Sequence, residues 1–223
     1  MTTSAQPLVV DRCTSGDFDE IARIMTDTML LGQPVPGVDI DEYVAACLSC
    51  YRMTAHSDAV VCRTGDNVAG YALISLDPRA AEGHARRQAM CLAAAIAVQW
   101  VTGRLSAPTR RFYKLRTIDT VALMRGTRNR GRVPHAHVNV VSGARSGRVA
   151  HALLQEVDRS VRTAGFDTWI GEINAVAGSR QGALERLGFT VLSRSRNHTL
   201  SGLSGRRVER LTVERCVPTD LSA

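Results

Sequence analysis

The sequence predicts an α/β domain in which strands and helices alternate along most of the 223 residues. The segment His135–Val141 alternates polar and apolar side chains, as a half-buried strand does. A turn rich in small residues follows, and then apolar residues recur at helical spacing, at Val149, Leu153, Val157 and Val161. Hydrophobic residues make up 44% and charged residues 22% of the chain. These values and the length favour one domain over residues 1–223.

The N-terminal half is expected to contain a strand, two helices and a hairpin. Asp17 is a candidate cap for the first helix, and Asp39 or Asp41 opens the second. The turn Gly65-Asp66-Asn67 separates two apolar runs, which is typical of a β-hairpin. The expected elements are a strand at Leu8–Cys13, helices at Phe18–Leu31 and up to Met53, and strands at Ala59–Arg63 and Val68–Leu76.

The segment from about 77 to 134 is predicted to hold two more helices, Ala80–Thr102 and Arg110–Arg125, followed by a basic loop. Residues 104–132 contain nine Arg or Lys and one acid, so the chain's net charge of +7 arises there. A solvated helix face explains such a run, and so would an acidic partner, the phosphates of a ligand, RNA or a second subunit. Aromatic residues are only 4% of the chain and no nucleic-acid motif is present, which argues against nucleic acid.

Cysteine usage and hydropathy indicate the cellular compartment. Cys47 and Cys50 form a Cys-x-x-Cys without a second pair for zinc, within a helical pattern, which favours buried free thiols and no metal site. No apolar run reaches membrane-spanning length, and the first ten residues lack the basic region of a secretory signal. We therefore expect a reduced, cytoplasmic protein that does not bind a membrane.

The turn before the helix at Val149 is a candidate anion site. The first turn of a helix has free backbone N–H groups and the positive end of the helix dipole, and Arg145 and Arg148 flank it here. The spacing is neither that of the nucleotide-hydrolase P-loop nor that of the dinucleotide-binding glycine turn. A different phosphate-bearing ligand is therefore indicated.

This segment resembles motif A of the GNAT superfamily, the acyl-coenzyme A-dependent N-acyltransferases, whose signature is (Q/R)-x-x-G-x-(G/A). The first and last places match, whereas Arg148 replaces the central glycine. Upstream, the run from His135 is similar to the H-L-H-I-N-L-L-P-E-A-R of some members, and Glu185–Phe189 resembles the family's Y-E-K-L-G-F. The six places of the signature are Arg145, Ser146, Gly147, Arg148, Val149 and Ala150.

The resemblance implies a mixed, mostly antiparallel sheet flanked by helices, with a helical insertion between the third and fourth strands. It also implies acetyl-coenzyme A as the acyl donor, with its pyrophosphate over the six places of the signature. The thioester would lie where the fourth and fifth strands splay apart. By the same resemblance, the backbone groups of Val140 and Val141 would bind the pantetheine.

Candidate catalytic residues follow from the same comparison. Glu172 matches an acidic place in the fifth strand and is the candidate general base. His137 and His135 lie on the same strand face as Asn139, and a histidine ordinarily titrates near neutral pH, so either is a second candidate. A structural role remains the alternative for Glu172 and for both histidines. The family's proton-donating tyrosine has no counterpart, because its position is Leu184.

The expected function is transfer of an acetyl or other short acyl group to an amine of a small molecule or peptide. One alternative is a catalytically silent acyl-coenzyme A-binding module with a regulatory role, which the missing tyrosine favours. Another is a nucleic-acid-binding protein that uses the basic segment. The segment from 77 to 134 is expected either to cover the acceptor side of the active site or to form a homodimer contact, because its first helix is too apolar to be left in water.

Overall fold

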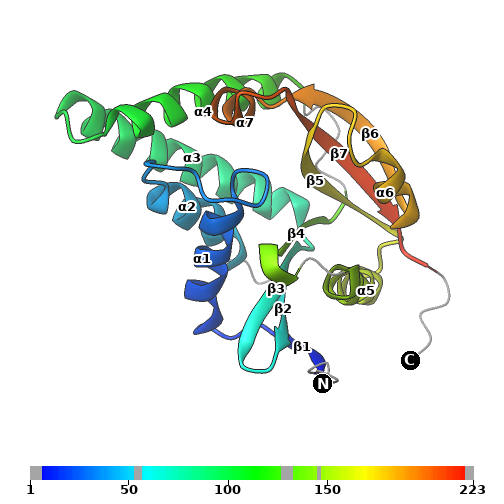
Figure 1. The fold of residues 1–223 in the computed structure, drawn as a ribbon. Coiled ribbons are helices and arrows are strands. Elements are labelled where there is room, and N and C mark those ends of the chain that lie inside the picture. Colours follow the sequence, from blue (N-terminus) through cyan, green and yellow to red (C-terminus); the bar gives the residue numbers. More distant parts are fainter. Residues whose placement is uncertain (1–6, 53–56, 127–132, 145–146, 219–223) are drawn as a thin grey trace, which may run out of the picture.

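The computed structural model describes residues 7–52, 57–126, 133–144 and 147–218. Within this part of the chain, seven strands form one sheet in the order β1-β2-β3-β4-β5-β7-β6. Neighbouring strands run antiparallel except for β4 and β5, which are parallel. Helices flank both faces of the sheet (Figure 1). The predicted α/β fold with a mixed, mostly antiparallel sheet is confirmed.

Strands and helices alternate along the chain as the residue patterns predict. The strands are β1 (Leu8–Arg12), β2 (Ser57–Thr64), β3 (Asn67–Ser75), β4 (His135–Val140), β5 (Thr168–Val176), β6 (Phe189–Arg196) and β7 (Val208–Cys216). The helices are α1 (Asp17–Thr28), α2 (Asp41–Arg52), α3 (Pro78–Val101), α4 (Ala107–Gly126), α5 (Gly147–Thr163), α6 (Gln181–Arg186) and α7 (His198–Ser204), with a 3₁₀ turn at Ser142–Ala144.

Helix α5 covers one face of the sheet, and α1 and α2 cover the other. The four apolar residues that predicted the inward face of α5 are all buried, with exposures of 3% or less, and pack against β2, β3 and β4. Each such aliphatic side chain stabilises the fold by about 1.5–3 kcal/mol. On the opposite face, residues of α1 and α2 pack against Tyr71 and Leu73 of β3. The packing on both faces fixes β3 and β4 in place.

Helix α1 begins one residue earlier than the sequence predicted. Gly16 occupies the cap position, and Asp17 is the first helical residue. The Asp17 carboxylate accepts hydrogen bonds from the backbone N–H and the hydroxyl of Thr14, and it pairs with Arg63 of β2. Asp17 is therefore not the cap. It ties the start of the helix to the sheet.

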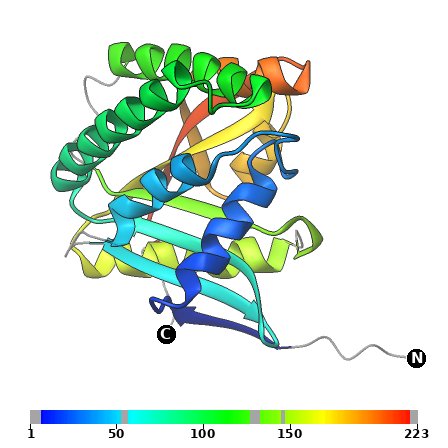
Figure 2. The same ribbon diagram turned by 90° about the vertical axis from the view of Figure 1, so that its left-hand side faces the viewer.

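Two helices connect β3 to β4, as the sequence predicted. The side chain of Asp77 accepts hydrogen bonds from the backbone N–H groups of Arg79 and Ala80 and so starts α3, which contains many alanines. Helix α3 packs on α2, whereas α4 packs on α7, so the pair bridges the two halves of the sheet (Figure 2). Only Ile96 of α3 is buried. None of the described helices has the length and apolar character needed to cross a membrane.

Candidate active site

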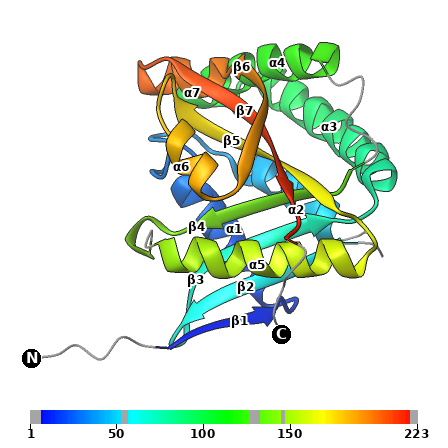
Figure 3. The same cartoon turned by 90° about the vertical axis from the view of Figure 1, so that its right-hand side faces the viewer.

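The strands β4 and β5 separate after a single point of contact. His135 pairs with Ile170, and the N–H of Ile170 donates to the carbonyl of Pro134 at 2.9 Å. No other registered pair joins these two strands in the described part of the chain. Because β4 stays paired with β3 and β5 with β7, a wedge opens between them (Figure 3). The wedge lies in the middle of the sheet.

Alternate residues of β4 direct their backbone groups into this wedge. The N–H of Val141 donates to the carbonyl of Ala69 at 3.0 Å, so the donor of Val141 is engaged with the β3 side. Because backbone groups alternate along a strand, Val138 and Val140 direct theirs toward β5. The N–H of Val140 donates to Oδ1 of the adjacent Asn139 at 2.9 Å. Val140 and Val138 thus border the gap, whereas Val141 does not.

The N-terminus of α5 lies beyond the end of β4 (Figure 3). Gly147 and Arg148 are exposed, and a Cβ added at Gly147 would meet nothing within 4 Å. Val149 buries its side chain in the core, and Ala150 is half-buried, so these two residues offer backbone rather than side-chain contacts. Arg145 and Ser146, also predicted to bind phosphate, lie outside the described residues. The helix start leaves room for an anion.

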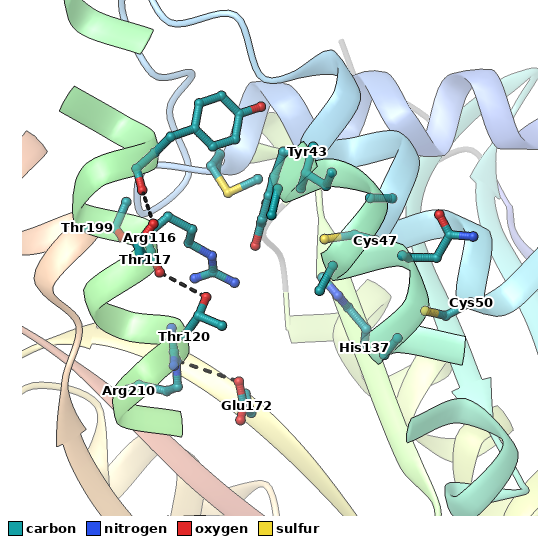
Figure 4. A pocket seen from close by; sticks show the side chains of 18 of the residues that line it. Tyr43, Cys47, Cys50, Arg116, Thr117, Thr120, His137, Glu172, Thr199 and Arg210 are labelled. Atoms are coloured by element: carbon teal, nitrogen blue, oxygen red, sulfur yellow. Dashed lines mark hydrogen bonds and ion pairs between the residues drawn. The ribbon is translucent and has the colours of Figure 1, made fainter. Parts of the chain in front are cut away.

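A cavity of 1320 Å³ lies on the α2 side of the wedge. Helices α2, α3 and α4 form its walls, and β4, β5 and β7 form its floor (Figure 4). The walls are mostly apolar, and Glu172 and Arg210 form an ion pair on the floor. Cys47 and Cys50 of α2 also line the cavity, as thiols rather than as a disulfide. The α3–α4 pair thus closes one side of the cavity.

Glu172 of β5 is on the floor of this cavity. Its carboxylate lies 3.6 Å from Nε of Arg210, a β7 residue whose side chain is only 5% exposed. Burial lowers the pKa of Arg210, and the charge of Glu172 opposes that shift. The pair therefore holds a carboxylate and a guanidinium together at the cavity floor.

His137 faces the same cavity from β4. Burial, reinforced by the nearby His135, lowers the pKa of His137 to about 4, although Glu172 acts in the opposite direction. The imidazole is therefore neutral and only weakly basic at neutral pH. His135 lies with its Nδ1 3.4 Å from the hydroxyl of Tyr51. Burial raises the pKa of the Tyr51 phenol, so this hydroxyl stays protonated.

Arg116 of α4 is a cavity residue that the sequence did not single out. Its guanidinium lies over the ring of Tyr43, 4.9 Å from the ring centroid, and faces the cavity (Figure 4). Burial alone would lower its pKa, but Tyr43, Cys47 and two carboxylates outweigh burial and the pKa is raised. The only sequence signal was membership in the basic segment 104–132, which did not separate Arg116 from the exposed Arg110 and Arg111.

The position of the family's tyrosine is part of the core. Leu184 of α6 is 4% exposed and packs in the same apolar cluster as Phe189. Ser179, which precedes α6, donates its hydroxyl to the carbonyl of Val176 at 2.6 Å. Arg180 occupies the cap position in a left-handed conformation, with φ 72°. Neither Leu184 nor Ser179 extends the polar floor of the cavity.

The structure brings Glu172 and His137 together in one cavity, and it places Val140 at the wedge that borders it. The described phosphate-site candidates, Gly147–Ala150, are grouped separately at the start of α5. No cluster of His, Cys, Asp or Glu suited to a metal ion occurs within residues 7–52, 57–126, 133–144 and 147–218. A donor with a long flexible arm could reach from the helix start into the wedge, and an acceptor could enter from the cavity.

Comparison with models of known protein families and with curated proteins finds no match to this sequence. Comparison with solved structures finds many similar folds. A ribosomal-protein-alanine N-acetyltransferase from Brucella melitensis is 17% identical, with a TM-score of 0.53 over 93% of this chain and 99% of that one. An N-acetyltransferase from Staphylococcus aureus Mu50 is 13% identical, with a TM-score of 0.53 over 95% and 99%. The yncA protein from Salmonella typhimurium, solved with its cofactor acetyl-CoA, is 14% identical, with a TM-score of 0.54 over 98% of both chains.

Proposed function

Because the chain has the GNAT fold, we propose that it transfers an acyl group, acetyl in the first instance, from acyl-coenzyme A to an amine. The observation that carries this proposal is the wedge between β4 and β5, which parts after the single pair His135–Ile170. The wedge joins a helix N-terminus at one end to a large cavity on one face. A reaction between a long phosphate-bearing donor and a separate acceptor fits that arrangement.

The donor's phosphates are assigned to the start of α5. Gly147 and Arg148 are exposed there, and the backbone N–H groups of the first turn favour an anion. Arg145 and Ser146 stay predictions for the same site. For the pantetheine we assign the backbone groups of Val138 and the carbonyl of Val140, because the N–H of Val141 already donates to Ala69 and the N–H of Val140 to Oδ1 of Asn139.

Glu172 is proposed as the general base. The acceptor enters as an ammonium ion, loses a proton to the Glu172 carboxylate, and its nitrogen then attacks the thioester carbonyl. An amide bond forms as the nitrogen releases a second proton to solvent, the carbon–sulfur bond breaks, and the leaving thiolate takes up a proton, which we also assign to solvent. His137 is less suited to the role of base, because a pKa of about 4 makes its imidazole weakly basic.

Binding of the donor is tested by thermal unfolding with acetyl-coenzyme A. A ligand at 100 times its Kd adds about 2.7 kcal/mol to the free energy of unfolding, which raises Tm by roughly 5–11 °C for a chain of this size. Gly147→Glu places a negative charge at the helix start and should weaken binding at least about tenfold. Gly147→Ala is the matched control, since a methyl group there has open space. A Tm that millimolar acetyl-coenzyme A does not move would refute donor binding.

Catalysis is tested with Glu172→Gln, which keeps the size of the side chain and removes its basicity. Release of free thiol from acetyl-coenzyme A in the presence of amines should fall by about 100- to 10,000-fold, the range of general-base catalysis. The affinity for acetyl-coenzyme A should stay unchanged, because Glu172 lies in the cavity and not at the start of α5. Turnover near that of the wild type would exclude Glu172 as the base.

A second candidate function is a silent acyl-coenzyme A-binding module. The observation that favours it is Leu184, an apolar core residue at the position where the resemblance places a proton-donating tyrosine. Such a module would show the same rise in Tm with acetyl-coenzyme A but would release no thiol with any amine. The two measurements together separate the enzyme from the module.

A further inference from the structure

The guanidinium of Arg116 faces the cavity without an anionic partner among the described residues. It lies over the ring of Tyr43. Asp119, one turn further along α4, has both carboxylate oxygens engaged by the first residues of α7. Among the described residues, the nitrogens of Arg116 are not fully buried polar atoms without a partner. They are therefore accessible from the cavity that Arg116 lines.

Arg210 and Arg116 are both cations at the cavity, and Glu172 pairs with Arg210 at 3.6 Å. Asp119 and Glu172 act on Arg116 only from a distance, and no described carboxylate forms an ion pair with it. The guanidinium therefore faces a mostly apolar space without a counter-ion in direct contact. A charge in such surroundings is costly unless a counter-ion meets it. A ligand that brings an anionic group would supply that counter-ion.

The walls above Arg116 are apolar. They come from the facing sides of α3 and α4 and present aliphatic and aromatic side chains to the cavity. Trp100, Ile118 and Val121 are 41–44% exposed, which is unusual for such large apolar residues. The wall residues used in this argument are Leu92, Ile96, Trp100, Phe112, Ile118 and Val121. An acceptor that buries an apolar body between these helices would cover that surface.

We propose that the acceptor is an apolar amino acid, whose carboxylate binds Arg116, whose amine faces Glu172 and whose side chain lies between α3 and α4. This assignment rests on the proposed acyl transfer. A planar guanidinium matches a carboxylate with two parallel hydrogen bonds, which a compact ammonium does not do. Glu172 acts electrostatically on Arg116, so the two side chains border the same space, as the amine and carboxylate of one small molecule require.

The donor's phosphates do not explain Arg116. Their proposed site is the start of α5, which packs on the face of the sheet opposite to α1 and α2. Helix α4 lies beside α7 and borders the cavity that α2 lines from another side (Figures 1 and 4). The positive charge of Arg116 therefore serves the acceptor side of the wedge.

The test compares matched acceptors and measures kcat/KM by thiol release and Kd by calorimetry. Leucine, methionine, phenylalanine and tryptophan are each set against their carboxamides, which keep the amine and the apolar body but lack the charge. A charged hydrogen bond contributes about 1.5–3 kcal/mol, so the best acid should be preferred over its amide by roughly 10- to 150-fold. Equal values for acid and amide across the panel would overturn the proposal.

Variants of α4 separate recognition from a structural role. Arg116→Met should lower kcat/KM for the acid by roughly 10- to 150-fold and for the amide much less, so that the preference for the acid disappears, and Arg116→Lys should restore part of that preference. Arg110→Met is the control, since Arg110 is exposed on the same helix and does not line the cavity. If Arg116→Met lowers acid and amide equally, Arg116 is structural and the proposal is wrong.

The two proposals fail in different ways. If acetyl-coenzyme A raises Tm and other amines release thiol but the apolar amino acids neither react nor bind, the acceptor assignment is wrong and acyl transfer stands. If no thiol is released with any amine, acyl transfer is wrong. Calorimetry then decides the acceptor site alone: binding of the acids by the wild type and not by Arg116→Met supports the anion site, and absence of binding overturns it.

Discussion

Replacing Asp119 with asparagine should detach α4 from α7 and loosen one wall of the cavity. The Asp119 side chain is 1% exposed, and each of its oxygens accepts two hydrogen bonds. Oδ1 accepts from the backbone N–H and Nδ1 of His198 at 2.7 and 3.0 Å. Oδ2 accepts from the backbone N–H and the hydroxyl of Thr199 at 2.9 and 2.6 Å. The carboxylate thus holds the first turn of α7 from a helix some 80 residues earlier in the chain.

The size of the effect follows from the geometry. Asparagine has the shape of aspartate, but its NH₂ group can only donate hydrogen bonds. In either orientation of the amide, this group lies opposite two donors that a carboxylate oxygen had accepted from. Two hydrogen bonds are lost, the other two lose their charge assistance, and buried donors are left unpaired. Each unpaired buried group costs about 1–3 kcal/mol, so the total loss in the free energy of unfolding should be roughly 2–4 kcal/mol. For a chain of this size this lowers Tm by roughly 4–16 °C.

The assay is urea unfolding followed by tryptophan fluorescence, with Asp27→Asn as the control. Asp27 is 53% exposed and forms a surface pair with Arg23 at 3.5 Å, which is worth at most about 1 kcal/mol. Because α4 is a cavity wall, Asp119→Asn should also raise KM for the acceptor more than Kd for acetyl-coenzyme A. A free energy of unfolding equal to that of the control would refute the assigned role of Asp119.

Three further predictions concern packing, helix propensity and pH. Gly70→Ala should lower the free energy of unfolding by about 1–3 kcal/mol, because its Cβ would lie 2.8 Å from the carbonyl oxygen of Asn139; stability like that of the wild type in a denaturant titration would contradict this. Gly83→Ala in α3 should raise it by about 0.5–1 kcal/mol, since nothing lies within 4 Å of that methyl group, and a loss in the same titration would contradict it. The pKa of Asp17 is lowered, chiefly by the backbone N–H of Thr14. The contribution of the ionised Asp17 carboxylate to the free energy of unfolding is therefore complete above the unfolded pKa of about 3.9 and is lost as the pH falls through the folded pKa. In Asp17→Asn, the free energy of unfolding should depend less on pH between about pH 5 and 2, as unfolding titrations would measure.

The sequence alone predicted the strand–helix segment from β4 to the end of α5. The reason is local: period-two alternation along β4 and helical spacing of four apolar residues along α5 both report which side chains face the core. Those four residues are buried as expected. The two helices between β3 and β4 were also predicted from their residue pattern, although α3 begins at Pro78 and not at Ala80. The offset of Asp17 by one position shows the usual limit of such local signals.

The cavity floor was only partly predictable. Glu172 was singled out through the resemblance and His137 through the alternation along its strand, and both line the cavity. No pattern in the sequence distinguished Arg116 from the other cations of a basic segment, because its burial depends on Tyr43, some 70 residues away.

Tertiary structure also decided the chemical state of the site. The alternation of polar and apolar residues along β4 does not indicate the pKa of His137. Burial, together with the nearby His135, lowers that pKa and makes His137 a weak base. Likewise, the sequence of β4 could not show which valine faces the wedge, since this depends on how β3 pairs with it. Local patterns determined the elements, whereas charge, protonation and access arose from contacts between residues far apart in the chain.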